Sequence, residues 1–246
     1  MLPVDVIGLD APGYPASLRS IPSPPSTLWV RGALPPAAAV AIVGTRRPTR
    51  FGCRVADATA RSAAAAGLAV ISGLAAGIDT IAHTSALAAG GTTYAVLGSG
   101  VDLPTPRSNA ALAAEIVSQG GGLLAEVPPG TPVCRRQLEA RDRIQSGLSI
   151  AVVICQCDTS SGAMHTARFS VIQGRLLVVV RPKGRDGAVN AYRGSAALAD
   201  PDGCDPALVH ARGTTAELFR DRRPIADVVI EDHEQLVELF GRLRAL

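Results

Sequence analysis

Aromatic residues are scarce in this chain, since Phe, Trp and Tyr together make up 3% of its 246 residues. Apolar residues of all kinds nevertheless reach 47%, and Ala and Gly are abundant. This composition excludes a disordered chain and is typical of closely packed α/β layers. A chain of this length can bury a full core as one large domain with a small appendage.

Strong charge and lysine are also lacking. The formal net charge is +3, which permits nucleic-acid binding without demanding it. Lys183 is the only lysine, so arginine supplies nearly all the cations. Arginine grips phosphate in a bidentate fork better than lysine does, but a GC-rich coding bias explains the preference equally well.

Signatures of metal sites and membranes are missing as well. The five cysteines form no CxxC pair and no His/Cys cluster with zinc-ligand spacing. Cys155 and Cys157 fall on or just after an apolar run, which predicts buried thiols. No run approaches the roughly 18 apolar residues of a membrane helix, and the N-terminus has no basic region followed by an apolar stretch. We therefore expect a cytoplasmic protein with no cofactor, no metal and no membrane contact.

Glycine-rich turns follow apolar runs at four places. The runs are 41–43, 68–71, 94–97 and 150–154, and the turns that follow contain Gly44, Gly73 with Gly77, Gly98 with Gly100, and Gly162. Repeated strand, turn and helix units build a parallel sheet with its turns on one edge. Backbone amides and helix N-termini at that edge attract phosphate, so the pattern predicts a phosphate-bearing ligand.

The expected fold is α/β, a doubly wound, mostly parallel sheet with helices on both faces. Its expected strands are 28–32, 40–43, 68–71, 93–97, 122–125, 150–154, 175–180 and 225–230, and its helices are 52–66, 77–89, 108–118, 161–172 and 232–244. Residues 135–143 are interpreted as an Arg-rich loop and 181–213 as loop-like. We expect a Pro-rich flap at 1–38, a core at 39–200 and a C-terminal extension with a strand and a helix at 201–246.

Three segments are candidates for phosphate binding. Gly44–Gly52 carries three arginines and two threonines directly after a strand, and its hydroxyls, amides and guanidinium groups would grip one or two phosphates. In the stretch 135–143, Asp142 could hold one of the arginines in place. Ser160-Ser161-Gly162 opens a helix, with Thr166 one turn on, and can serve as a cap and a ligand contact together. The alternative for the two arginine-bearing segments is a solvated surface, and for the serines a cap alone.

Catalytic patterns are weak. Ser72–Asp79 is not a GxGxxG loop, and no acidic residue ends the next strand, which disfavours a nicotinamide dinucleotide. Asp79 and His83 form either a helical acid/base pair or a stabilised helix N-terminus with a buried histidine. Ser99 is not in a GxSxG elbow, and no histidine sits in a hydrolase pattern. The sequence therefore favours a binding protein over an enzyme.

Taken together, these stretches resemble the DprA/Smf family of bacterial DNA-processing proteins over about residues 14–195. The matching segments are Tyr14-Pro15, Leu28–Gly32, Ile42–Arg46, Ser72–Asp79 with Ala82-His83, Gly90–Thr92, Val96–Asp102, Leu124–Glu126, Arg141–Ile144 and Ser161–Ala163. The resemblance implies an extended Rossmann fold in a homodimer that binds single-stranded DNA, protects it and loads the RecA recombinase during transformation and recombination. It also implies that Thr45, Arg46 and the stretch 135–143 contact the DNA backbone.

The residues expected at the DNA or phosphate site come from all these turns. They are Gly44, Thr45, Arg46, Thr49, Arg50, Ser72, Gly73, Gly77, Gly98, Gly100, Arg135, Arg136, Arg141, Arg143, Ser161, Gly162, Thr166 and Asn190.

The chain also departs from the family pattern. The usual Phe-Pro before an Arg-Asn-Arg is here Gln137-Leu138 before Arg141-Asp142-Arg143. The missing aromatic removes a base-stacking platform worth about 1–3 kcal/mol per base, and Asp142 adds a negative charge. We expect no winged-helix tail after residue 200. A diverged member with weaker or altered DNA binding is the resulting expectation.

Two alternatives remain open. A nucleotide-binding sensor or nucleotide-cleaving enzyme of the same Rossmann superfamily would hold a small ligand, with Glu126 or Asp79 as an acid. Several arginines spread over 135–143 suit a polymer better than one small ligand. An inactive scaffold or immunity component is the other alternative.

Overall fold

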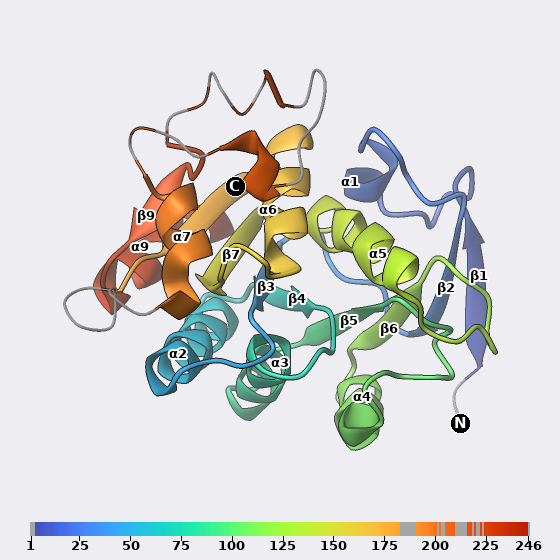
Figure 1. Cartoon of the computed structure of the whole chain (residues 1–246). Coiled ribbons are helices and arrows are strands. Elements are labelled where there is room, and N and C mark those ends of the chain that lie inside the picture. The colour runs from blue at the N-terminus through green and yellow to red at the C-terminus, as the bar shows by residue number, and fades with distance from the viewer. Residues whose placement is uncertain are drawn as a thin grey trace.

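The computed structural model describes residues 3–182, 190–200, 202, 205–209, 216–217, 219, 222 and 224–245. Within these residues, one sheet of nine strands runs through the molecule in the order β1–β2–β6–β5–β4–β3–β7–β8–β9 (Figure 1). The strands are β1 (Val4–Gly8), β2 (Thr27–Gly32), β3 (Ala39–Gly44), β4 (Ala69–Ser72), β5 (Thr93–Leu97), β6 (Gly122–Ala125), β7 (Ala151–Gln156), β8 (Leu176–Val180) and β9 (Val228–Ile230). Pairs among β3 to β9 are parallel, whereas β2 pairs antiparallel with β1 and β6.

Helices cover both faces of the sheet. They are α1 (Ala16–Arg19), α2 (Arg50–Ala65), α3 (Ile78–Ala88), α4 (Ala110–Ser118), α5 (Arg135–Gly147), α6 (Ala163–Ile172), α7 (Arg193–Leu198) and α9 (His233–Arg244), with short 3-10 turns η1 (Arg107–Asn109), η3 (Asn190–Tyr192) and η4 (Pro206–Val209). The buried clusters place α2, α3, α4 and α9 on one face and α1, α5, α6 and α7 on the other. The predicted doubly wound α/β fold is thereby confirmed.

The central strands are apolar on both faces because helices cover both. On β3, Val40 and Ile42 pack toward α2 and α3, while Ala41 and Val43 pack toward α6. Such strands read as continuous apolar runs rather than as alternating ones, which is why the sequence locates them well. Cys155 and Cys157 are buried, as predicted.

The chain changes direction across the sheet between β3 and β7. From β3 the chain adds β4, β5 and β6 on one side, then returns to place β7, β8 and β9 on the other. The carboxyl ends of β3 and β7 therefore lie next to each other with their following loops diverging. This is the switch point at which open α/β sheets leave a crevice for a ligand.

Three segments differ from the sequence-based expectation. The Arg-rich stretch 135–143 is not a loop but belongs to helix α5, which begins with the Cys134 amide donating to Gln137 Oε1 at 2.9 Å. The Pro-rich segment 1–38, expected as a flap, supplies β1 and β2 to the edge of the main sheet. The interval 181–213 was expected to be loop-like, but its described residues include helix α7. Other residues of this interval lie outside the described part of the chain. The division at residues 38 and 200 stays a prediction.

None of the helices in the described part of the chain combines the length and the apolar character needed to cross a bilayer.

Candidate functional site

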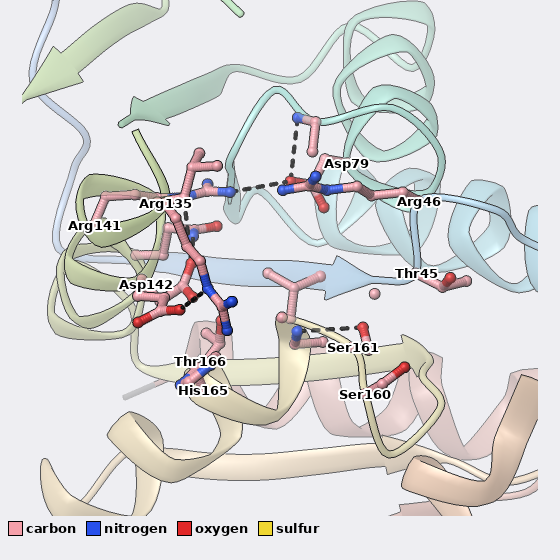
Figure 2. A pocket seen from close by; sticks show the side chains of 18 of the residues that line it. Thr45, Arg46, Asp79, Arg135, Arg141, Asp142, Ser160, Ser161, His165 and Thr166 are labelled. Carbon is pink, nitrogen blue, oxygen red and sulfur yellow. Dashed lines mark hydrogen bonds and ion pairs between the residues drawn. The ribbon is translucent and has the colours of Figure 1, made fainter. Parts of the chain in front are cut away.

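A pocket of about 820 Å³ opens at the switch point between β3 and β7 (Figure 2). The loop after β3 supplies Thr45, Arg46 and Arg47 to its lining, and the segment after β7 supplies Asp158 and residues 160–163. In Figure 2, α5 closes the opposite side with Arg135, Arg141 and Asp142. The volume falls within the range of about 300–1,000 Å³ that is usual for ligand sites.

The loop after β3 is fixed by its backbone and presents cations. The Thr45 amide donates to the Gln156 carbonyl at 2.8 Å, and the Ile78 amide donates to the Thr45 carbonyl at 3.1 Å. The Arg47 amide donates to Thr45 Oγ1 at 3.2 Å. Arg46 and Arg47 are exposed, and neither forms a salt bridge with any residue that the structure describes. Two guanidinium groups are thus available to an anion in the pocket.

Glycine at position 77 allows this loop to lie against α3. Gly77 has a φ of +84°, and a Cβ there would lie 2.5 Å from the Thr45 carbonyl oxygen. Any other residue would push the start of α3 away from the loop after β3. The predicted role of Gly77 at the site is therefore indirect, because it positions Thr45 and does not line the pocket.

The N-terminus of α6 faces the pocket from the β7 side. Ser161 Oγ accepts from the Ala163 amide at 3.3 Å, and Ser160, Ser161 and Gly162 all line the pocket. The helix dipole attracts an anion here, although the first amides already donate within the turn, the Met164 amide to the Ser161 carbonyl at 3.0 Å and the His165 amide to the Gly162 carbonyl at 2.9 Å. Asp158 partly offsets this attraction, since hydrogen bonds from the Ser160 backbone and side chain hold the pKa of its carboxyl below the usual range. A bound phosphate would share these donors with Asp158.

Arg141 is held inside the molecule by three oxygen atoms. Its side chain is 7% exposed, with Nε 3.2 Å from Asp142 Oδ1 and Nη2 3.9 Å from Asp79 Oδ2. Nη1 donates to the Val96 carbonyl at the end of β5 at 3.1 Å. The guanidinium therefore ties α5 to the first turn of α3 and to β5.

Asp142 carries a carboxyl at the pocket whose pKa is shifted by its surroundings. Burial raises its pKa to about 7; Asp79 and Glu139 add to the rise, while Arg141 and Arg46 oppose it. Gln145 Nε2 donates to its Oδ1 at 3.0 Å. The charge of the pocket therefore changes near neutral pH.

Arg143 is also engaged internally. Its Nη2 lies 2.6 Å from Glu126 Oε2, its Nη1 donates to Glu126 Oε1 at 2.9 Å, and its Nε donates to the Ser23 carbonyl at 2.8 Å. These contacts join α5 to the end of β6 and to the N-terminal segment. The stretch 135–143 is thus not the free basic loop expected from the sequence, because Arg141 and Arg143 already have anionic partners.

Of the predicted site residues, eight line the pocket: Gly44, Thr45, Arg46, Arg135, Arg141, Ser161, Gly162 and Thr166. The others lie outside its lining: Thr49, Arg50, Ser72, Gly73, Gly77, Gly98, Gly100, Arg136, Arg143 and Asn190.

Several of the outlying residues shape the surroundings instead. Thr49 caps α2 by accepting from the Gly52 amide at 3.1 Å. Ser72 donates to the Ile42 carbonyl at 2.7 Å. Gly98 leaves room for α5, since a Cβ there would meet Leu138 at 3.0 Å.

Sequence reasoning missed most of the polar face of α5 and the acidic side of the pocket. Glu139, Gln145, Asp158 and His165 line the pocket, and none of them was named as a site residue from the sequence. Arg47 lines it as part of the predicted segment Gly44–Gly52. Positions 135, 138, 139, 142 and 145 follow the three- and four-residue spacing of one helix face. That spacing would have revealed the face had 135–147 been recognised as a helix.

Of the two interpretations of Asp79 and His83, the structure supports the stabilised helix N-terminus with a buried histidine. Asp79 Oδ2 accepts from the amides of Gly73 at 3.1 Å and Ala75 at 3.4 Å. His83 is buried, with Nδ1 2.7 Å from Thr93 Oγ1, and burial lowers its pKa to about 3. A neutral histidine outside the pocket lining supports packing rather than proton transfer.

Comparisons with known proteins agree with the resemblance. The family model described as DNA recombination-mediator protein A matches residues 5–199. Protein Smf of Synechocystis sp. is 41% identical over 167 residues, which cover 65% of this chain and 42% of that protein. Protein Smf of Escherichia coli is 36% identical over 186 residues, covering 74% and 50%. The chain thus spans about half the length of these curated relatives.

Solved structures show the same fold. DNA processing protein A of Streptococcus pneumoniae superposes with a TM-score of 0.72 at 25% identity, covering 95% of this chain and 73% of that chain. DNA processing protein A of Helicobacter pylori, described for its single-stranded DNA binding mode, superposes with a TM-score of 0.73 at 24% identity, covering 98% and 97%.

Proposed function

The chain belongs to the DNA recombination-mediator protein A family, and we propose that it binds single-stranded DNA at the pocket between β3 and β7. One observation supports the proposal most strongly: two exposed arginines after β3 and the N-terminus of α6 border the same pocket. Cations, hydroxyls and amides in one groove suit the phosphates of a strand without reading its sequence. The single-stranded DNA binding described for the Helicobacter pylori relative agrees with this proposal.

Phosphate groups are expected to enter between Arg46 and Ser161. The hydroxyls of Thr45 and Ser161 would donate to one phosphate. Arg46 and Arg47 would neutralise that phosphate and its neighbour. Arg135 stands at the mouth, where its Nε lies 2.8 Å from Glu139 Oε1. That exposed pair contributes little to stability, so Arg135 can exchange Glu139 for a DNA phosphate.

A single strand suits the pocket better than a duplex does. One nucleotide of a flexible single strand can unstack and enter a cavity, whereas the bases of a duplex stay stacked and paired. Natural single-strand binders often add stacking on Phe, Tyr or Trp, and none of these three residue types occurs among the described residues that line this pocket. The proposed affinity is therefore mainly electrostatic.

The biological role proposed here is that of a recombination mediator. In this role a homodimer coats and protects single-stranded DNA and loads the RecA recombinase during transformation and recombination. The family description supports the mediator role.

Arg46→Glu tests the assignment of the β3 loop. Reversing the charge removes one phosphate contact and adds repulsion, so affinity for a labelled dT oligonucleotide should fall at least about tenfold in fluorescence anisotropy. Arg242→Glu makes the same charge change on α9, outside the pocket lining, and should leave the affinity within about twofold. Equal affinities of wild type and Arg46→Glu would overturn the assignment.

A small nucleotide is the second candidate ligand. The pocket volume lies in the range of sites for small ligands, which is compatible with a single nucleotide. Cleavage of such a nucleotide has less support, because Glu126 is paired with Arg143 and Asp79 accepts two backbone amides. Calorimetry with mononucleotides would favour this candidate if they bound while dT oligonucleotides did not.

A further inference from the structure

The deep side of the pocket is rich in hydrogen-bond acceptors, which phosphate does not explain. Asp142 and Gln145 line it on successive turns of α5, and they are 6% and 1% exposed. Gln145 Oε1 is buried and has no hydrogen-bond partner among the described residues. A buried acceptor without a donor is unfavourable, so a ligand that donates a hydrogen bond at this position would be favoured.

Asp142 also keeps one oxygen for a ligand. Its Oδ1 is close to Arg141 Nε and accepts from Gln145 Nε2. Asp142 Oδ2 accepts no hydrogen bond from the described part of the chain, and it is not fully buried. It therefore offers an acceptor to the pocket. Two acceptors on one side of a cavity select a ligand with two neighbouring donors.

Among nucleobases, guanine meets this requirement best. Its N1–H and N2–H lie side by side and can donate together to a carboxylate, whereas adenine and cytosine offer one amino group. Thymine offers only N3–H between two carbonyl oxygens, which ionised carboxylates repel. Unstacked bases are commonly recognised on such edges by side chains in single-strand pockets.

We propose that the pocket holds a guanine base of the bound strand through Asp142, with Gln145 as the neighbouring acceptor, while Arg46 and the α6 N-terminus hold its phosphate. This inference rests on the proposed single-strand binding and adds a base preference to it. Asp79 and Glu139 also line the pocket and strengthen its preference for donors.

Anisotropy titrations at about pH 8, where Asp142 is ionised, test the preference with three oligonucleotides. They are a dT strand, the same strand with isolated dG substitutions, and the same strand with deoxyinosine, which lacks the N2 amino group. The dG strand should bind about fivefold tighter than dT, as one good base pairing implies, and deoxyinosine should lie between them. Equal or tighter binding of dT, with all strands bound, overturns the guanine subsite and leaves single-strand binding intact. Absence of binding by all three overturns both.

Two variants assign the preference to a residue. Asp142→Asn keeps the size of the side chain but removes a charged acceptor, so the dG advantage should shrink to less than about twofold. Asp5→Asn makes the same change on the exposed strand β1 and should keep the full advantage. An unchanged dG advantage in Asp142→Asn contradicts the inference. The deoxyinosine comparison in wild type still tests the inference should that variant fold poorly.

Discussion

The arginines at and near the pocket divide into two groups, those exposed to a ligand and those held in internal ion pairs. Arg46 and Arg47 stay exposed, whereas Arg141 and Arg143 are committed to internal pairs. A buried pair is weak evidence for net stability, but loss of one partner is strongly unfavourable. Substitutions at the first two arginines should therefore affect ligands, and substitutions at the last two should affect folding first.

Asp142 gives the pocket a dependence on pH. Burial raises its pKa to about 7, so the carboxyl gains a proton as the pH falls through that value and one negative charge leaves the pocket. Affinity for a dT strand should thus rise by about threefold or more between about pH 8 and pH 6.

Comparison with Asp142→Asn isolates this effect, because every other residue that lines the pocket is the same in wild type and variant. The variant should bind dT more tightly than wild type at the higher pH and equally at the lower pH. The same pH profile in both proteins would rule out Asp142 as the source.

The sequence located only part of this residue-scale organisation. Thr45 and Arg46 follow an apolar run and a glycine, so local pattern alone places them at the edge of the sheet. Arg141 lies against its neighbour Asp142, as the sequence suggested, but its second partner, Asp79, is far away in the chain. Arg143 pairs with Glu126, which follows a different element. No local pattern separates a paired arginine from a free one, because the pairing depends on which strands become neighbours.

Among the secondary-structure elements, the buried strands were predicted from the sequence better than helix α5 was. Buried parallel strands are runs of apolar residues and need no knowledge of their neighbours. Helix α5 instead buries Arg141, Asp142, Gln145 and Ser146, and its density of charge resembles a surface loop. Its polar residues are buried because the first turn of α3 and the end of β5 supply partners for Arg141.

Gly73→Ala tests how tightly α5 is joined to the loop after β4. A Cβ at position 73 would lie 1.3 Å from Arg141 Nη1, so Arg141 must leave its place between Asp79 and Asp142. Breaking a buried pair typically costs about 3–5 kcal/mol, and we expect a loss of unfolding free energy of about 3 kcal/mol or more in urea denaturation.

Gly8→Ala is the matched control, since no atom lies within 4 Å of a Cβ added there. It should change the free energy of unfolding by no more than about 0.5 kcal/mol. A loss in Gly73→Ala as small as that in Gly8→Ala would show that Arg141 does not need its observed position.

At the scale of the whole molecule, the pocket exists because the chain reverses its direction across the sheet. Segments 43–47 and 158–166 are more than a hundred residues apart, yet β3 and β7 are neighbours. Alternating strand and helix patterns in the sequence predict a doubly wound sheet. In such sheets ligands bind at the carboxyl ends of the strands, so the sequence also predicts the edge that binds the ligand. The strand order itself, and with it the acidic side of the pocket, depends on packing between distant segments and was not predictable from local pattern.

The salt dependence of single-strand binding tests the central claim most directly. A labelled dT oligonucleotide should bind more tightly than a duplex of the same length, and its affinity should fall between about 50 and 200 mM salt with a log–log slope of about −0.7 for each phosphate neutralised. With Arg46, Arg47 and Arg135 at the pocket, the account predicts a slope of about −2, on the assumption that each arginine neutralises one phosphate. A flat response, or equal binding of duplex and single strand, would contradict an electrostatic single-strand groove at this pocket.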